Sequence, residues 1–388
     1  MESQMSINQG IITLLQLPNI GRKTVYNFLM DFSKSLKYDN NPKEYFFSDQ
    51  EEVIECFQSG KEFYEKIVRE NLMLASKKAE NIINLSESLD IKIINIFDKN
   101  YPSRLRKIPD PPPIVYTKGN LKCLSKDITI AVVGTRNPTS FGEKAAEKIG
   151  GLLARCDIPV VSGLAEGSDS FAQQGCVDQN GETIAVLAHG LDQIYPRQNE
   201  NLALNIISSN GCLFSEYPPG MRPSRFSFVD RDRLQSGLSD EVIVIETGIK
   251  GGTMHTVKFC LDQKKILGCL NHSPEFLGLF QVSGNQQLIL EKKATPIYFN
   301  YFINEKSNKV DVEDSIITFI KKLKTKKNLE DEIYLKIENN INNFLMEDNF
   351  LLAKDRADES LPKKVTRTKK KTSTKNSDKV QKKLLTGD

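Results

Sequence analysis

The chain contains 388 residues with a mass of 43.8 kDa, which exceeds what one compact core usually holds and predicts two or three domains. Its 39% hydrophobic and 27% charged residues exclude a wholly disordered chain and a membrane protein, and no apolar run approaches the roughly 20 residues of a spanning helix. Seven cysteines without a C-x-x-C pair argue against a disulfide framework or a zinc ribbon. Because the opening residues lack a basic and then apolar signal segment, we expect a cytoplasmic protein with no membrane association.

The formal net charge of +3 is an average over two unlike parts. Residues 361–388 hold ten Lys/Arg and two acidic residues, a charge of +8, so residues 1–360 carry −5. Lysines interleaved with Thr and Ser provide no core-forming side chains, which predicts that residues 357–388 are a disordered basic tail. Such a tail is either a solubilising end or an arm that binds a polyanion.

Residues 1–90 are predicted to form a helical domain, because their apolar residues recur at helical spacing. Between the first two helical patterns lies Leu17-Pro18-Asn19-Ile20-Gly21-Arg22-Lys23-Thr24, which has the form of a helix-hairpin-helix turn. In such a turn the glycine permits a tight backbone, and the next helix directs free N–H groups toward a phosphate. An ordinary helical turn with a glycine cap is the alternative.

A proline-rich segment opens the next domain, which we expect to span residues 91–300. Its sequence Asp110-Pro111-Pro112-Pro113 predicts a linker or an edge strand, because proline cannot donate to a central ladder. Beyond residue 127, apolar runs of strand length cover residues 128–133, 158–161, 183–187, 212–214, 242–245 and 266–270. Their alternation with helical patterns predicts a doubly wound, mostly parallel α/β sheet with helices on both faces. A later return to helical spacing predicts a small helical or winged-helix module over residues 308–356.

Ligands bind an open parallel sheet beyond the carboxyl ends of its strands, so the loops after the apolar runs are the candidate sites. The first loop carries Gly134 and Arg136 but lacks the three glycines of a dinucleotide-binding fingerprint, and no ATPase phosphate loop occurs in the chain. The second loop, residues 162–169, places Ser162 and Gly163 just before a predicted helix start, which suits one phosphate. The alternative is that its glycines only permit a tight turn.

The segment from residue 222 to residue 233 is the strongest indication of function. It contains four arginines and two phenylalanines: Arg222, Arg225, Phe226, Phe228, Arg231 and Arg233. Arginines supply charge for a phosphate backbone and aromatic rings supply flat faces for unstacked bases, a pairing typical of single-stranded nucleic-acid sites. The alternatives are that the two phenylalanines alternate on a strand, with one facing the core, and that one of the last two arginines pairs with Asp230 or Asp232.

The loop after residues 242–245 contains Lys250, Gly251 and Gly252 at a predicted helix start, which suits an anion, although a plain strand-to-helix connection is the alternative. An enzyme has little support, because the three histidines are far apart and neither a nucleophile elbow nor a metal-ligand cluster occurs. Glu246 and Asp169 are expected to cap helices and pair with nearby arginines rather than act as acid and base. We expect no metal and no cofactor.

Taken in order, these loops resemble the DNA-processing protein A family (DprA, also called Smf). The resemblance rests on co-linear motifs: Tyr101-Pro102-x-x-Leu105, Asp110-Pro111-Pro112, Gly134-Thr135-Arg136, Ser162-Gly163-Leu164-Ala165-x-Gly167-x-Asp169, Gly190-Leu191-Asp192-x-Ile194-Tyr195-Pro196, Ser215-Glu216-Tyr217-Pro218, Arg231-x-Arg233-x-x-x-Gly237-Leu238-Ser239 and Gly284-Asn285-x-x-Leu288-Ile289. Each motif alone is weak, but the ordered set is highly specific and covers roughly residues 95 to 297. It implies a Rossmann-like domain, preceded in many members by a helical domain of helix-hairpin-helix or SAM-like type.

The resemblance also implies function. Members bind single-stranded DNA without catalysis, form homodimers and help load the recombinase RecA onto incoming DNA in natural transformation. By motif matching, the DNA phosphates would contact Arg136, Ser162, Gly163, Arg231 and Arg233, and Phe226 or Phe228 would stack on bases. Charge and position add Arg222, Arg225 and Lys250 to this set.

Three positions depart from the usual pattern of the family. Asp232 replaces a common asparagine, Gln173 replaces a common histidine, and Gly251-Gly252-Thr253 stands where Ser-Gly-Ser is usual. Asp232 adds negative charge at the expected site, so we expect it to orient Arg231 or Arg233 rather than touch DNA. Two other functions stay open: a nucleotide-binding or nucleotide-hydrolysing enzyme of a related fold, with Glu246 as its acid or base, and an adaptor for a recombinase.

Overall fold

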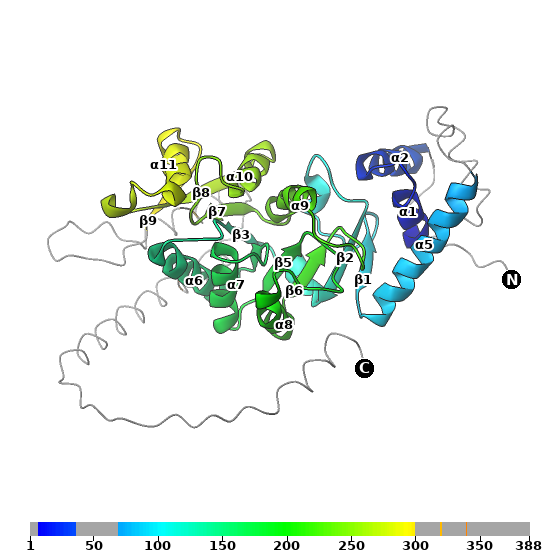
Figure 1. Cartoon of the computed structure of the whole chain (residues 1–388), viewed down its shortest axis with the longest axis horizontal. Coiled ribbons are helices and arrows are strands. Elements are labelled where there is room, and N and C mark those ends of the chain that lie inside the picture. Colours follow the sequence, from blue (N-terminus) through cyan, green and yellow to red (C-terminus); the bar gives the residue numbers. More distant parts are fainter. Residues whose placement is uncertain (1–6, 36–68, 299–318, 320–338, 340–388) are drawn as a thin grey trace, which may run out of the picture.

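The computed structural model describes residues 7–35 and 69–298 together with residues 319 and 339. Nine strands in this part of the chain form one sheet, in the order β1-β2-β6-β5-β4-β3-β7-β8-β9 (Figure 1). The expected module at residues 308–356 and the basic tail at residues 357–388 lie outside the described residues, apart from Phe319 and Asn339.

Seven neighbouring strands of this sheet are parallel. They are β3 (Ile130–Val133), β4 (Val160–Ser162), β5 (Thr183–Leu187), β6 (Cys212–Ser215), β7 (Glu241–Val244), β8 (Ile266–Asn271) and β9 (Thr295–Tyr298). Ile130 of β3 lies opposite Val160 on one side and Glu241 on the other, so β3 occupies the centre. The doubly wound α/β fold predicted from six apolar runs is confirmed, and β9 is an additional strand.

The proline-rich segment ends in an antiparallel edge. Strand β1 (Lys92–Asn95) pairs with β2 (Ile114–Gly119), and β2 in turn pairs antiparallel with β6. Pro112 lies just before β2, where its carbonyl accepts a 2.8 Å hydrogen bond from the buried Tyr101 hydroxyl. Strand β1 is thus the edge strand of the sheet, whereas the prolines at 111–113 lie in the connection before β2.

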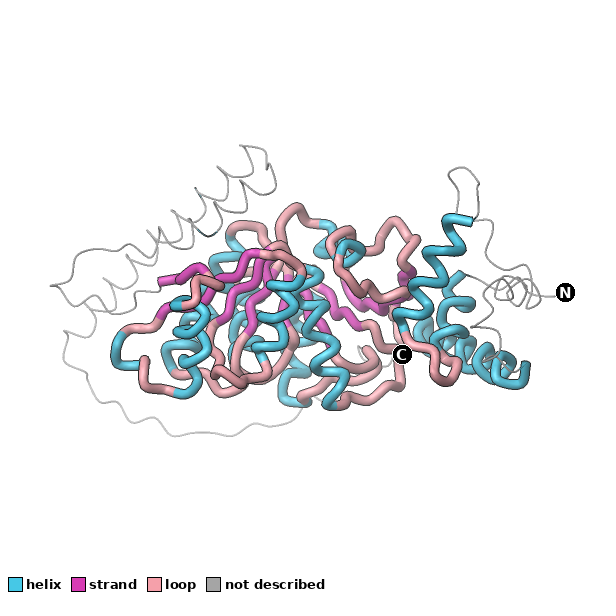
Figure 2. The backbone as a smooth tube through the Cα atoms, turned by 90° about the horizontal axis from the view of Figure 1, so that it is seen from above, coloured by secondary structure: helices cyan, strands magenta, loops and turns pink. Residues whose placement is uncertain are grey.

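Alternation along the strands decides which helices cover each face of the sheet. Ile130 and Val132 pack with α6 (Ser140–Arg155) and α7 (Ser168–Asp178), while Ala131 and Val133 pack on the other face with α9 (Arg225–Leu238), α10 (Thr253–Asp262) and α11 (Ser283–Leu290). Helix α8 (Glu200–Ser208) packs near the β5 and β6 end. Figure 2 shows the strands running between the two helical layers.

Short 3-10 helices complete the connections: η1 (Leu105–Lys107), η2 (Leu121–Ser125), η3 (Arg197–Asn199), η4 (Pro274–Phe276) and η5 (Phe280–Val282). Within the described residues, none of the helices is both long and apolar enough to cross a bilayer.

Three helices from the first ninety residues lie together at one end of the molecule (Figure 1). They are α1 (Ile7–Leu15), α2 (Arg22–Ser35) and α5 (Arg69–Ser88). Ile11, Leu29 and Ala79 from these helices belong to the same buried cluster as Ile114 and Leu187 of the sheet. Helices thus occupy the described part of the predicted helical domain, of which residues 1–6 and 36–68 lie outside the described residues, and their core is continuous with that of the sheet.

Candidate nucleic-acid interface

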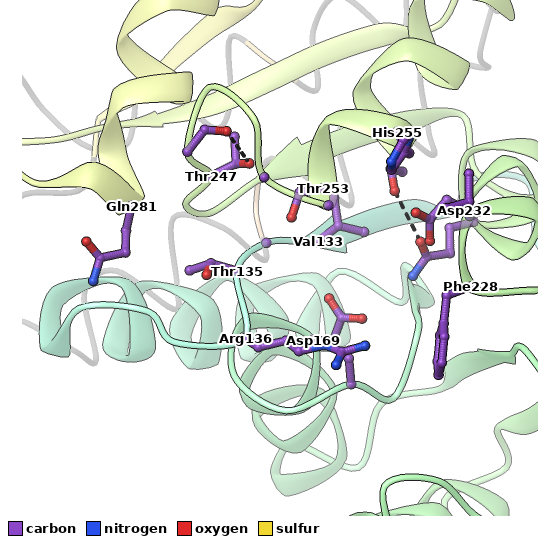
Figure 3. Close-up of a pocket in the computed structure, with 18 of the residues that line it drawn as sticks. Val133, Thr135, Arg136, Asp169, Phe228, Asp232, Thr247, Thr253, His255 and Gln281 are labelled. Atoms are coloured by element: carbon purple, nitrogen blue, oxygen red, sulfur yellow. Dashed lines mark hydrogen bonds between the residues drawn. The ribbon is translucent and has the colours of Figure 1, made fainter. Parts of the chain in front are cut away.

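A cavity of about 410 Å³ lies at the carboxyl end of the sheet (Figure 3). The chain leaves β3 toward α6 on one face and leaves β7 toward α10 on the other, so the loops after these adjacent strands diverge and leave a crevice. The lining includes Gly134, Thr135 and Arg136 after β3, Thr247, Gly251, Gly252, Thr253 and His255 around the start of α10, and Phe228, Arg231, Asp232 and Gln235 on α9. The cavity therefore joins the loops after β3, β4 and β7 with helix α9, regions that the sequence indicated as candidate sites.

Close packing brings the β3 loop against the start of α7. A Cβ built on Gly134 would lie 2.4 Å from Oγ of Ser168, so no larger residue fits there without a shift. Ser168 donates a hydrogen bond to the carbonyl of Thr135 at 3.1 Å, which fixes the loop. The next residue, Arg136, is thereby directed to the mouth of the cavity, where it is exposed.

Helix α9 forms a wall of the cavity and begins with a capping box. Ser224 Oγ accepts from the backbone N–H of Ser227 at 3.1 Å, and Ser227 Oγ accepts from the backbone N–H of Ser224 at 2.8 Å. Phe226 and Phe228 therefore lie on a helix, and the alternative that they alternate on a strand is wrong. Residues two apart point in different directions on a helix, so Phe226 projects into solvent with 86% exposure while Phe228 lines the cavity.

Phe228 has a cation and a second ring beside it. The guanidinium carbon of Arg136 lies 5.4 Å from the centroid of the Phe228 ring, within the range of a cation–π contact. The ring of Tyr195 lies 5.8 Å from Phe228 on another side. These three side chains also surround a smaller hollow of about 30 Å³ that reaches Gly163. The cavity mouth thus carries one guanidinium beside two aromatic rings.

Arg231 is buried, with 5% exposure, and lines the cavity from α9. Its Nη1 atom lies 3.6 Å from Oδ1 of Asp232, so the pairing that the sequence predicted for Asp232 forms with Arg231. Burial raises the pKa of Asp232 to about 7, although the charge of Arg231 acts to lower it. Nε of Arg231 is buried without a hydrogen-bond partner among the described residues.

Asp169 holds the second loop in place. Its carboxylate accepts a 3.0 Å hydrogen bond from the backbone N–H of Gly163. Burial raises the pKa of Asp169, and the charge of Arg231 and backbone hydrogen bonds from Gly163 and Ala165 oppose that rise. Asp169 therefore fixes the loop after β4 by a backbone hydrogen bond, and it interacts with Arg231 through charge.

Two of the expected phosphate contacts are turned away from the cavity. The Ser162 side chain is buried and its hydroxyl donates to the carbonyl of Val132 at 2.7 Å. Arg233 is 3% exposed, forms an ion pair with Glu216 and donates to the carbonyl of Asp110 at 2.8 Å. Both side chains are committed to interactions inside the fold.

Four other predicted residues lie on exposed surface: Arg222, Arg225, Phe226 and Lys250. Arg225 and Phe226 form the first turn of α9, and Lys250 directly precedes Gly251 of the cavity wall. Arg197, which was not in the predicted set, is exposed immediately after Pro196 of the smaller hollow. Its place in the loop after β5 is the signal that could have identified it.

Glu246 does not face the cavity. It is fully buried, accepts from the backbone and hydroxyl of Thr139 at 2.7 and 2.6 Å, and lies 2.9 Å from Nε2 of His272. It therefore caps the start of α6 as expected, but its ionisable partner is a histidine rather than an arginine. A buried carboxylate held in this way is not placed to act on a ligand in the cavity. Among the described residues, no group of three His, Cys, Asp or Glu side chains could hold a metal ion.

This chain is similar in sequence to proteins of a known family. A model of the family described as DNA recombination-mediator protein A matches residues 92–306, more than half of the chain. The chain belongs to this family. Relatives include Protein Smf of Synechocystis sp., 40% identical over 181 residues, or 46% of this chain and 45% of the relative. DNA processing protein DprA of Bacillus subtilis is 39% identical over 173 residues, or 45% of this chain and 58% of the relative.

Solved structures of the DNA recombination-mediator protein A family have the same fold. DprA from Streptococcus pneumoniae gives a TM-score of 0.60 at 25% identity, covering 76% of this chain and 95% of that chain. DNA processing protein A from Helicobacter pylori, described by its single-stranded DNA binding mode, gives 0.51 at 27% identity, covering 60% and 97%. The chain spans about half the length of the curated relatives that it matches.

Proposed function

We propose that this protein binds single-stranded DNA at the carboxyl end of its sheet. The observation that carries the proposal is the cavity between the diverging loops after β3 and β7. There the exposed Arg136 lies over the Phe228 ring, and the buried Arg231 lines the wall. Arginine presents a planar set of donors that matches phosphate oxygens, and a buried Nε without a partner gains most from such an acceptor. The single-stranded DNA binding mode of the Helicobacter pylori relative supports the same ligand.

The aromatic residues favour a single strand over a duplex. Phe226 is almost fully exposed and Phe228 and Tyr195 line the wall beside Arg136. Rings of this kind stack on bases, and bases are available for stacking only where they are unpaired. We assign phosphate contacts to Arg136 and Arg231 and the exposed rim to Arg197, Arg222, Arg225 and Lys250. Gly163 makes room for Arg231, while Ser162 and Arg233 support the site from inside.

The family relationship extends the proposal to a place in recombination. A protein that holds unpaired DNA at an arginine-lined cavity can present it to a recombinase, and loading of RecA during DNA uptake is the role that follows. A cytoplasmic homodimer without a cofactor fits that role.

The test is a titration of labelled oligo-dT and of a duplex of equal length at several salt concentrations. We expect tighter binding of the single strand, with affinity that falls as salt rises because counterions are released. Arg136→Ala and Arg231→Ala should weaken binding, whereas Arg155→Ala, at the far end of α6, should not. Equal affinity for both DNA forms, or wild-type binding by both site variants, would overturn the proposal.

A further inference from the structure

Arg22 connects the N-terminal helices to the helix that carries the candidate DNA site. It is the first residue of α2 and follows the turn that resembles a helix-hairpin-helix. Its guanidinium reaches two carboxylates far away in sequence, Asp110 before β2 and Asp230 on α9. One side chain thus joins three segments that the sequence places in different parts of the chain.

The guanidinium of Arg22 forms hydrogen bonds to a different carboxylate on each of two edges. Nη1 and Nη2 of Arg22 donate to Oδ2 and Oδ1 of Asp230 at 2.8 and 3.2 Å, a two-pronged pairing. Nε and Nη2 donate to Oδ2 of Asp110 at 3.1 and 3.0 Å. All three nitrogens are engaged, so a DNA phosphate could bind Arg22 only by displacing carboxylates.

The carboxylates that surround Arg22 depend on its positive charge. Asp110 also lies 3.5 Å from Arg233, which pairs with the buried Glu216. Two guanidinium groups therefore face three carboxylates in this cluster. Burial acts to raise the pKa of Asp230, but the hydrogen bond and charge of Arg22 and the charge of Arg233 outweigh it and lower that pKa. Without Arg22, the three carboxylates would face the single guanidinium of Arg233 and the charge of Lys23, which also acts on Asp230.

The turn itself departs from the expectation drawn from its sequence. The left-handed backbone falls on Asn19, with φ of 64°, rather than on Gly21. Lys23, next to Arg22, is exposed and acts on Asp230 through its charge, whereas Arg22 also donates hydrogen bonds to Asp230. The two neighbouring cations of the turn therefore have different surroundings, which provides a matched control.

We propose that Arg22 is a positioning residue: it docks the N-terminal helices on α9 and so holds the DNA-facing turn of that helix, instead of contacting DNA phosphates. We call the pairing of Arg22 with Asp230 the clamp. Asp230 lies between Phe228 and Arg231 in sequence, so the clamp holds α9 on the side away from the cavity, at the same turns that present Phe228 and Arg231 to the cavity. This inference rests on the proposed function for its DNA readout, while docking itself can be measured without DNA.

The first experiment is hydrogen exchange on the full chain without DNA, comparing wild type with Arg22→Gln, Asp230→Asn and Lys23→Gln. We expect faster exchange of amides in α2 and in the first turns of α9 in both clamp variants, and no change in Lys23→Gln. The double variant Arg22→Gln/Asp230→Asn should show less than the summed effect, because both changes break one interaction. Unchanged exchange in Arg22→Gln, or fully additive effects, would overturn the clamp.

The second experiment is a salt titration with oligo-dT. We expect Arg22→Gln to weaken binding by about two- to thirtyfold without changing the slope of log affinity against log salt, as for a residue that acts through others. Asp230→Asn should also weaken binding, although it removes a negative charge. If Arg22 instead contacts a phosphate, the slope should become shallower by about 0.7 and Asp230→Asn should strengthen binding. Failure of wild type to bind oligo-dT would sink the proposed function but leave the exchange result valid.

Discussion

The guanidinium of Arg231 occupies the space where a side chain at position 163 would lie. A Cβ built on Gly163 would come within 1.8 Å of Nη1 of Arg231 and 2.6 Å of Nε2 of Gln235. The glycine after β4 and the arginine on α9 therefore fit each other across the cavity wall. Gly163 acts by leaving room, a role distinct from that of a flexible turn.

Gly163→Ala should displace Arg231 and weaken DNA binding although no charge is removed. Overpacking of this kind costs about 1–3 kcal/mol of folding free energy. We expect a reduced affinity for oligo-dT, a lower melting temperature and a native circular-dichroism spectrum. Gly278→Ala is the control, because a Cβ there meets no atom within 4 Å and Gly278 does not line the cavity. Wild-type affinity in Gly163→Ala would show that the position of the Arg231 guanidinium does not matter for binding.

Arg136→Ala should remove one phosphate contact from the mouth of the cavity. The slope of log affinity against log salt should become shallower by about 0.7, the value for one phosphate of a single strand. The melting temperature should change little because the side chain is exposed. Arg136→Lys, which keeps the charge but loses the planar face over Phe228, should restore the slope more fully than the affinity. A slope equal to that of wild type in Arg136→Ala would exclude the contact.

Phe226 and Phe228 should differ in what their removal costs. Phe226→Ala should weaken oligo-dT binding by about 1–3 kcal/mol if the ring stacks on one base, with no loss of thermal stability because the ring is exposed. Phe228→Ala should lower both affinity and melting temperature, since it also removes packing against Tyr195 and Arg136.

A conservative pair of variants checks this assignment. Phe226→Tyr keeps a flat ring and should bind like wild type, whereas Phe226→Leu keeps only the apolar character and should bind like Phe226→Ala. Equal binding by the tyrosine and leucine variants would rule out base stacking by residue 226.

The fold could be predicted because the strands of a parallel sheet are buried on both faces. Runs such as residues 242–245 are continuously apolar, and Val242 and Ile243 are both buried although they face opposite layers. Strand β9 was missed because its sequence, Thr295–Tyr298, contains a proline and only half-buried or exposed positions around Ile297. Short edge strands of this kind owe their pairing to the neighbouring strand rather than to their own pattern.

The candidate site was only partly predictable, because charge in the sequence does not tell which arginines face solvent. Arg231 and Arg233 lie two positions apart on α9, yet one lines the cavity and the other joins the carboxylates around Asp110. The sequence showed that both arginines are present. It did not show that they lie on a helix, where residues two positions apart point in different directions. Likewise, the hydroxyl of Ser162 has a carbonyl partner on the neighbouring strand, which no local pattern reveals.

Asp232 should make DNA binding depend on pH near neutrality. Burial raises the pKa of its carboxyl to about 7, and the charges facing it are those of Arg231, Asp169 and Arg136. Phosphates placed in the cavity would raise that pKa further, so binding should take up a proton. Affinity for oligo-dT should therefore increase as the pH falls from about 8 to about 6, because protonation removes a negative charge from a polyanion site.

The same shift fixes the sign of the effect on stability. The native pKa lies above the unfolded value of about 3.9, so the native state binds the proton more tightly and its contribution to stability is lost as the pH rises toward 7. Asp232→Asn should flatten both profiles and bind oligo-dT at pH 8 at least as tightly as wild type. A pH profile of Asp232→Asn that is as steep as that of wild type would show that this carboxyl is not the source of the effect.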